Sequence, residues 1–273
     1  MSDSRCGKES PRLPYDYFEV PASARIWDYW LGGHDNYLVD REAGDAWERI
    51  QPEIRTFARQ SRRFLARSVR YLAGEAGMRQ FLDIGAGLPA EQNTHEVAHE
   101  LGPESKIVYL DNDPLVIALT RALLAGGVSG TGSVNYLDAD LRDVEWVISG
   151  ARRTLDFAEP IAVMFMGVLG HVVDFEAARA IVAEVMDAVP SGSHLAICDG
   201  TDTDAAARKA SEKYAETGAV AYNLRSPEQM ARYFGGLQLV EPGLVPVNRW
   251  RPDSAESGAT ESVDRYGGVA RKP

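Results

Sequence analysis

The chain of 273 residues is 45% hydrophobic and 25% charged, a balance that indicates a packed globular protein and argues against global disorder. Its formal net charge of -11 argues against general binding to nucleic acid phosphates or anionic membranes. The N-terminus lacks the apolar core of a signal peptide, and no apolar run approaches the roughly 18 residues of a membrane span. We therefore expect a cytoplasmic protein with no membrane segment and no nucleic-acid partner.

The chain contains two cysteines, Cys6 and Cys198. Cys6 lies in a polar N-terminal stretch and Cys198 lies in an apolar run typical of a buried strand, so we expect no disulfide between them. No cluster of cysteine and histidine has the spacing of zinc ligands, and the sequence predicts no metal site.

The N-terminal quarter of the chain carries helical rather than strand patterns. Residues 1–20 are predicted to form a flexible tail and residues 21–76 a helical cap. Gly32-Gly33 divides the first part of the cap into two short helices, and apolar residues at near-helical spacing predict a long helix over 54–76. The arginines of that helix indicate a solvated face, with an anion or partner site as the alternative: Arg55, Arg59, Arg62, Arg63, Arg67 and Arg70.

Residues 77–273 alternate between apolar strands and amphipathic helices, and are predicted to form the cofactor-binding domain. This alternation predicts an α/β fold with a Rossmann-like, seven-stranded, mostly parallel sheet and helices on both faces. The last strand is expected to be antiparallel, and the sheet to form one compact unit with the N-terminal helical cap. Strands are predicted at 80–84, 106–110, 133–137, 160–169, 194–198, 237–250 and 266–270. Helices are predicted at 89–101, 115–124, 177–189, 205–215 and 227–234, with a loop at 252–262.

A glycine-rich turn, Gly85-Ala86-Gly87, follows the first predicted strand directly. Glycine lets a backbone turn sharply and approach a ligand closely, and the free N–H groups of a following helix point at the same place. The pattern alone also fits an ordinary tight turn between a strand and a helix. Asp83, two residues before the first glycine, adds a carboxylate beside the turn.

Two further acids end neighbouring strands. Asp111 follows the second strand, where a carboxylate can accept hydrogen bonds from both hydroxyls of a ribose. Asp140 and Leu141 follow the third strand, where a carboxylate can accept a proton from an adenine amino group and a backbone N–H can meet a ring nitrogen. Ligands of open α/β sheets bind beyond the carboxyl ends of the strands, so these acids together indicate a cofactor that contains a nucleoside.

The segments LDIGAG, YLDNDP and DADLRD resemble the class I S-adenosylmethionine-dependent methyltransferases. A closer likeness covers almost the whole chain, because PASARIWDYWLGGHDNY, RQFLDIGAGLPAEQNTHEVA, ADLRD and YGGVARKP are similar to a bacterial family named S-adenosyl methyltransferase, formerly classed as a domain of unknown function. The resemblance implies S-adenosyl-L-methionine as the cofactor and S-adenosyl-L-homocysteine as its product. Two residues depart from the family pattern: His34, where lysine is more usual, and Ser61, where asparagine is more usual.

The same resemblance implies a set of cofactor-binding residues. The glycine turn packs under the methionine part, the acid after the second strand holds the ribose, and the N-terminal segment lies over the pocket. The residues so implied are Arg25, Tyr29 and Gly33 near the methionine end, Asp83, Gly85, Ala86 and Gly87 at the turn, Asp111 and Asn112, Asp140 and Leu141 at the adenine, and Gly167.

Methyl transfer from a sulfonium is an in-line displacement in which positioning and desolvation can supply much of the catalysis. A base is needed only where the acceptor loses a proton. His171, at the end of the fourth strand, is the leading candidate because the pKa of imidazole lies near neutrality, and a structural histidine is the alternative. Four aromatic residues of the cap either line an acceptor pocket or anchor the cap on the sheet: Trp27, Tyr29, Trp30 and Tyr37.

The function predicted from these patterns is transfer of a methyl group from S-adenosylmethionine to a small-molecule acceptor. Two alternatives retain the cofactor fold, namely an elimination or cyclisation in secondary metabolism and a non-catalytic binding or regulatory role. The turn also fits Gly-x-Gly-x-x-Ala, a dinucleotide-binding pattern. Against a nicotinamide cofactor stand Asp83, the position of Asp140-Leu141 and the terminal YGGVARKP.

Overall fold

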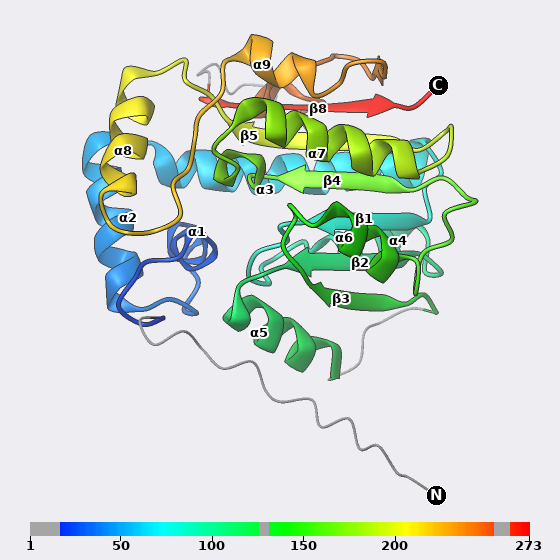
Figure 1. Ribbon diagram of the computed structural model, residues 1–273, viewed down its shortest axis with the longest axis horizontal. Helices are drawn as coiled ribbons and strands as arrows, with labels where there is room; N and C mark the ends of the chain where they lie inside the picture. Colours follow the sequence, from blue (N-terminus) through cyan, green and yellow to red (C-terminus); the bar gives the residue numbers. More distant parts are fainter. Residues whose placement is uncertain (1–16, 126–130, 254–262) are drawn as a thin grey trace, which may run out of the picture.

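A mixed sheet forms the centre of the computed structural model, which describes residues 17–125, 131–253 and 263–273. The described strands run in the order β3-β2-β1-β4-β5-β8-β6, with β7 paired to β8 (Figure 1). The first five are parallel, and β8 is antiparallel to β5. The bounds are β1 Gln80–Ile84, β2 Lys106–Asp111, β3 Val134–Asp138, β4 Ala162–Met166, β5 His194–Gly200, β6 Gln238–Leu239, β7 Val245–Pro246 and β8 Arg265–Arg271.

Two apolar cores cover the two faces of this sheet. Alternate strand residues such as Phe81 and Leu82 point to opposite faces, because successive side chains of a strand alternate. One core contains residues of α1 (Ser23–Leu31), α2 (Leu38–Ile50), α3 (Ile54–Arg70), the π-helical turn Tyr71–Glu75, α4 (Thr94–Leu101) and α8 (Ala205–Ala215). The other contains residues of α6 (Val144–Ala151), α7 (Phe175–Ala188) and α9 (Pro227–Arg232), while α5 (Pro114–Ala125) packs beside β3. Within the described residues no helix is long and apolar enough to cross a membrane.

The predicted α/β fold with a seven-position, mostly parallel sheet is confirmed, but its seventh position differs from the prediction. A continuous strand over 237–250 is wrong, because the chain there forms only the two short strands β6 and β7 on the free edge of β8. Pro242 has no backbone N–H, and Gly243 adopts a φ of +89°. Both interrupt a strand ladder.

Two helix predictions also need correction. The helix expected over 89–101 begins only at Thr94, since Gln92 adopts a φ of +58° and Asn93 forms a capping box with Glu96. Helix α6 has no counterpart in the sequence prediction, although Asp143 caps it through the backbone N–H of Trp146 at 3.1 Å. The predicted loop at 252–262 falls almost entirely outside the described residues.

The parallel strands point their carboxyl ends toward the N-terminal helices. In Figure 1 the arrowheads of β1 to β4 face the side of the molecule where α1, α2 and α8 lie. The fourth strand stops at Met166 rather than at the predicted residue 169, because Gly167 turns the chain out of the sheet with a φ of +79°. A short 3-10 helix, Leu169–His171, follows immediately. This edge of the sheet is where an open α/β fold binds its ligand.

Candidate functional site at the carboxyl edge of the sheet

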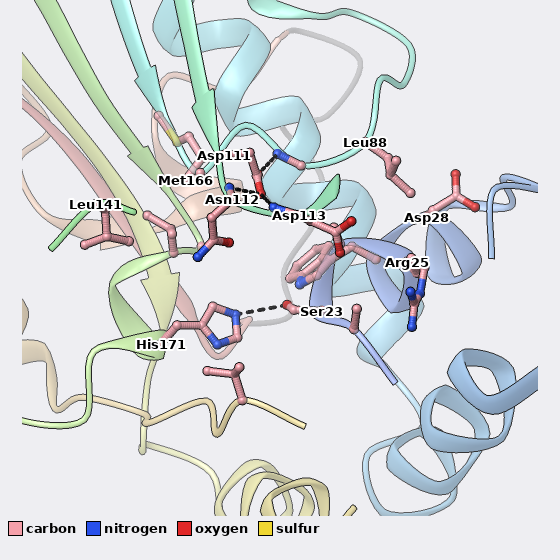
Figure 2. Close-up of a pocket in the computed structure, with 18 of the residues that line it drawn as sticks. Ser23, Arg25, Asp28, Leu88, Asp111, Asn112, Asp113, Leu141, Met166 and His171 are labelled. Carbon is pink, nitrogen blue, oxygen red and sulfur yellow. Dashed lines mark hydrogen bonds between the residues drawn. The ribbon is translucent and has the colours of Figure 1, made fainter. Parts of the chain in front are cut away.

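A cavity of about 450 Å³ opens at this edge. Its walls come from the segments that follow β1, β2, β3 and β4 on the sheet side, and from α1 and α3 on the other side (Figure 2). Nine of the residues that the sequence assigned to the cofactor or to catalysis line it: Arg25, Gly85, Gly87, Asp111, Asn112, Asp140, Leu141, Gly167 and His171. The topology therefore brings together side chains that are far apart in the chain.

The glycine turn has the backbone geometry for which glycine is needed. Gly85 and Gly87 adopt φ values of +75° and +68°, in the left-handed region. The backbone N–H groups of Gly85 and Ala86 both donate to the carbonyl of Leu110, at 2.8 and 3.1 Å, which fixes the turn against β2. A Cβ on Gly85 would overlap the side chain of Val168, so the turn packs directly against the segment after β4.

The Asp111 carboxylate is held by backbone donors at the end of β2. Its Oδ2 accepts the N–H of Gly87 at 2.9 Å, and its Oδ1 accepts the N–H groups of Asn112 and Asp113 at 2.9 and 3.0 Å. Burial raises the pKa of Asp111, and the hydrogen bonds from the three backbone N–H groups oppose that rise. Figure 2 shows the carboxylate at the cavity wall between the turn and Asp113. The acid and the glycine turn thus form one rigid unit.

The segment after β3 supplies a second acid to the same wall. Arg142 binds both carboxylate oxygens of Asp140, with Nε to Oδ1 at 2.9 Å and a terminal nitrogen to Oδ2 at 2.6 Å. These hydrogen bonds from Arg142 lower the pKa of Asp140, although partial burial acts in the opposite direction. Asp140 is therefore an ionised acceptor at neutral pH, and Leu141 and Asn112 lie beside it on the cavity wall.

The cap closes the cavity through a chain of buried polar contacts. Arg25 is only 1% exposed and forms an ion pair with Asp40 at 2.8 Å. Each of its two terminal nitrogens donates to a carbonyl, that of Tyr17 at 3.1 Å and that of Val20 at 2.6 Å. The hydroxyl of Tyr17 donates to Asp113 at 2.6 Å, which links the segment before α1 to the end of β2. Residues 1–16 of the predicted tail lie outside the described residues, whereas residues 17–20 pack against the cap.

Four residues assigned to the cofactor by resemblance lie behind the cavity wall. Tyr29 donates its hydroxyl to Asp45 at 2.7 Å, and a Cβ on Gly33 would overlap the carboxylate of Asp28. Ala86 contributes its backbone N–H to the turn, as described above. The fourth, Asp83, is 2% exposed and accepts the hydroxyl of Thr94 at 2.6 Å; burial raises its pKa to about 6. The contacts of Gly33 and Ala86 reach the wall residues Asp28 and Leu110, whereas Tyr29 and Asp83 contact residues outside the wall.

His171 faces the cavity from the 3-10 helix after β4. Its Nδ1 lies 3.2 Å from the carbonyl oxygen of Ala221, and its Nε2 lies 3.0 Å from the Ser23 hydroxyl of α1 (Figure 2). A carbonyl can only accept, so Nδ1 carries the proton and Nε2 presents its lone pair toward Ser23. Burial lowers the pKa of His171, and the hydrogen bond to Ala221 opposes it in part. The imidazole is therefore neutral at pH 7 and able to accept a proton.

Several cavity residues had no signal in the sequence. Ser23, Asp28 and Arg265 line the cavity, and they come from α1 and β8. Arg62 of α3 also lines it, and it belongs to the arginines for which an anion or partner site is the alternative interpretation. The four aromatic residues that the sequence singled out in the cap lie in different surroundings. Trp27 lines the cavity, whereas Trp30 stacks edge-on against Trp47, Tyr37 lies under the guanidinium of Arg25, and Tyr29 lies under that of Arg55. No motif or spacing in the sequence indicated that Arg265 lies at this edge of the sheet.

Comparison with known proteins adds a family to this geometry. The sequence matches the family described as S-adenosyl methyltransferase over residues 15–273. A DUF574 family protein from Streptomyces avermitilis has a crystal structure similar to this one, with 40% identity, a TM-score of 0.90, and coverage of 96% of this chain and 100% of that chain. A crystal structure from Thermobifida fusca has 37% identity, a TM-score of 0.84, and coverage of 93% and 96%.

A more distant likeness concerns the fold alone. The magnesium protoporphyrin IX methyltransferase of Synechocystis, solved with S-adenosylhomocysteine bound, has 11% identity, a TM-score of 0.52, and coverage of 91% of this chain and 93% of that chain. No curated protein matches the chain.

Proposed function

This chain belongs to the S-adenosyl methyltransferase family, and from that premise we propose that it binds S-adenosylmethionine in the carboxyl-edge cavity and transfers its methyl group to a small-molecule acceptor. The family is one of S-adenosylmethionine-dependent methyltransferases. Three parts of the cavity wall support this placement, because they follow one another in the same order as the adenine, ribose and methionine parts of the cofactor. They are the acid after β3 for the adenine, the acid after β2 for the ribose, and the glycine turn after β1 for the methionine.

The fixed carboxylate of Asp111 is the observation that carries the proposal. Three backbone N–H groups hold its two oxygens, so the carboxylate meets a ligand without losing rotamer freedom on binding. A ribose offers two adjacent hydroxyl donors, which match an acceptor of this kind. The hydrogen bond from Gly87 also couples the ribose position to the turn that approaches the methionine part. The geometry therefore suits a nucleoside that is extended by a polar chain.

The two ends of the cofactor are assigned from charge. Asp140 is ionised and oriented by Arg142, so we assign it to the adenine amino group, with the backbone of Leu141 at a ring nitrogen. Arg25 lines the cavity, but its donors are engaged by its ion pair and by two carbonyls. Arg62 instead lies over the segment after the glycine turn, where it donates to the carbonyl of Glu91 and to the side-chain oxygen of Asn93, at 2.8 Å each, and its second terminal nitrogen has no hydrogen bond among the described residues. We assign Arg62 to the methionine carboxylate.

The chemistry that remains is alignment of the acceptor and removal of its proton. The sulfonium of the bound cofactor supplies a methyl group that is already activated. His171 presents a neutral Nε2 to the cavity, and Ser23 occupies the position that an acceptor hydroxyl or amine would take. An acceptor that displaces the Ser23 hydroxyl from Nε2 would pass its proton to that nitrogen, since the tautomer is fixed by Ala221. The apolar wall, including Met166 and Val168, keeps water from the reacting centre.

Calorimetric titration with S-adenosylmethionine, S-adenosylhomocysteine and NAD tests the proposal. We expect both sulfur nucleotides to bind with micromolar dissociation constants, and NAD not to bind. Transfer of label from methyl-labelled S-adenosylmethionine to a small-molecule pool then tests the reaction itself. Absence of binding by both sulfur nucleotides to folded protein would refute the cofactor assignment. If the sulfur nucleotides bind but the product that depends on the protein carries no label, the reaction is an elimination or cyclisation rather than methyl transfer.

A further inference from the structure

Arg265 places a buried cation at the end of the cavity away from the adenine position. It begins β8, pairs in register with Gly200 of β5, and is only 5% exposed. Its guanidinium lies 3.9 Å from the position a Cβ on Gly167 would occupy, so it borders the turn after β4. Across the sheet, β8 is separated from β2 and β3, which carry the ribose and adenine acids, by β1, β4 and β5. Arg265 therefore belongs to the acceptor end of the cavity.

The guanidinium of Arg265 is held by aromatic rings rather than by a carboxylate. Its carbon lies 4.4 Å from the ring centre of Trp27 and 5.8 Å from that of Tyr222. Among the described residues its one hydrogen bond goes to the Tyr222 hydroxyl, at a long 3.4 Å, and no carboxylate forms an ion pair with it. A guanidinium carries five N–H donors in a planar fork that matches a carboxylate. Most of the donors of Arg265 are thus available to a ligand.

Other buried arginines of the described chain are satisfied differently. Arg25 has its ion pair with Asp40, and Arg225 donates to the carbonyls of Val172 and Val173 at 2.6 and 2.9 Å. Asp199 is the carboxylate whose charge acts on Arg265, but its oxygens already accept hydrogen bonds from other groups. Its carboxylate accepts the Tyr222 hydroxyl and the backbone N–H groups of Gly170, at 3.1 Å, and Gly200, at 2.9 Å.

Removing a cation from water is costly unless a partner compensates for it. Burial works against the charge of Arg265, but Tyr222, Cys198 and Asp199 together outweigh it, so its pKa is raised and the guanidinium stays charged. The stacked aromatic rings orient the fork and exclude water from its faces. A cation fixed in this way gains most from an anion that enters through the cavity.

We propose that Arg265 binds a carboxylate group of the methyl acceptor, and that the acceptor is therefore a small carboxylic acid with an apolar body. This inference rests on the proposed function and names the substrate class of the same cavity. Tyr222 contacts both Arg265 and the ring of His171, whose centre lies 5.1 Å from its own. A carboxylate on Arg265 therefore anchors an acceptor whose reacting group lies near Nε2 of His171. Trp27, Met166 and Val220 supply apolar contacts for its body.

Binding of matched acids and amides to protein saturated with S-adenosylhomocysteine tests this inference. The probes are acetate, benzoate and phenylacetate, each beside its neutral amide, titrated by calorimetry at millimolar concentrations. We expect at least one acid to bind the wild-type protein about tenfold or more tightly than its amide. Arg265→Gln should remove that preference by about ten- to a hundredfold, because a charge-assisted hydrogen-bonded pair is lost. Arg265→Lys should retain part of it, since the charge remains without the fork.

Arg225→Gln is the matched control, because it also removes a buried arginine but one that does not line the cavity. It should lower the unfolding temperature without changing the acid-to-amide ratio. If Arg265→Gln fails to fold, the Arg265→Lys ratio decides the question, and a ratio equal to wild type would overturn the inference.

Three further outcomes separate the possible failures. No preference for acids in the wild-type complex with S-adenosylhomocysteine would refute the acceptor assignment while leaving the cofactor site intact. If Arg265→Gln binds S-adenosylhomocysteine more weakly than wild type but binds 5′-methylthioadenosine equally well, Arg265 contacts the methionine carboxylate, and the inference is overturned. Failure of S-adenosylhomocysteine to bind the wild-type protein would instead refute the proposed function, on which the inference rests.

Discussion

Replacing Asp111 by asparagine tests the centre of the proposed cofactor site. The side chain keeps its shape, but one carboxylate oxygen becomes an NH2 group. The least costly orientation keeps the oxygen on the N–H groups of Asn112 and Asp113, so that the NH2 group faces the N–H of Gly87, which loses its acceptor. A ribose hydroxyl also loses a charged acceptor, which is worth about 1.5–3 kcal/mol. At about 1.4 kcal/mol for each factor of ten, we expect the Kd for S-adenosylhomocysteine to rise by about 10- to 150-fold.

Calorimetric titration of folded Asp111→Asn with S-adenosylhomocysteine and with adenosine measures this effect. Both ligands carry the ribose, so both should lose affinity by a similar factor. Asp138→Asn is the matched control, because Asp138 pairs in register with Asp111 on β3 but is exposed and lies outside the cavity wall. Its Kd should stay within about threefold of wild type, a range of less than 1 kcal/mol. The ribose assignment is wrong if Asp111→Asn shows an equally small change, or if adenosine binding alone is unaffected.

Three further substitutions test residues in and behind the cavity wall by chemical unfolding. Burial raises the pKa of Asp83 to about 6 from its ordinary 3.8, so ionisation of this carboxyl destabilises the fold as the pH rises from about 4 through 6. Asp83→Asn should therefore be more stable than wild type by at most about 3 kcal/mol at pH 8, and this gain should vanish near pH 4. Gly85→Ala should lower the free energy of unfolding by about 1–3 kcal/mol more than Gly77→Ala does. Both glycines have a left-handed φ, but only a Cβ on Gly85 would overlap Val168, so equal losses would contradict this packing. Burial lowers the pKa of His171, so protonation destabilises the fold as pH falls below about 6.5; His171→Gln should lose less stability than wild type between pH 7 and 5, and parallel curves would contradict it.

The parts of the fold that depend on local pattern could be predicted from the sequence. The bounds of β1 and α8 agree with the predictions residue for residue, because an apolar run or a helical period is complete within each segment. The glycine turn and the acid after β2 also have local signals. The prediction of one strand over 237–250 was wrong because it followed the hydrophobic pattern and disregarded Pro242 and Gly243, which interrupt the ladder.

The acceptor end of the cavity could be predicted only in part: the sequence offers His171 and Trp27 as candidates, but the residues that they meet acquire their positions through tertiary structure. Ser23 meets His171 because α1 crosses the carboxyl edge of the sheet, and the two residues are 148 positions apart. Arg265 meets Trp27 because β8 runs antiparallel to β5 and returns its first residue to the same edge. Neither pairing has a spacing that a sequence pattern could reveal.

This difference in origin has a consequence for specificity. Apart from Arg62 of α3, the proposed cofactor contacts come from turns that directly follow β1, β2 and β3, and the hydrogen bond between Gly87 and Asp111 couples the first two of these turns. The proposed acceptor contacts come from α1, β8, the segment around Val220 and the end of β4 with its 3-10 helix, and Trp27 and Val220 lie on parts of the chain distant from the ribose acid in sequence. Changes to Trp27 or Val220 can therefore reshape the acceptor pocket without moving the ribose acid. A fold that binds one cofactor can in this way serve different acceptors, because distant substitutions with no shared contacts act additively on binding.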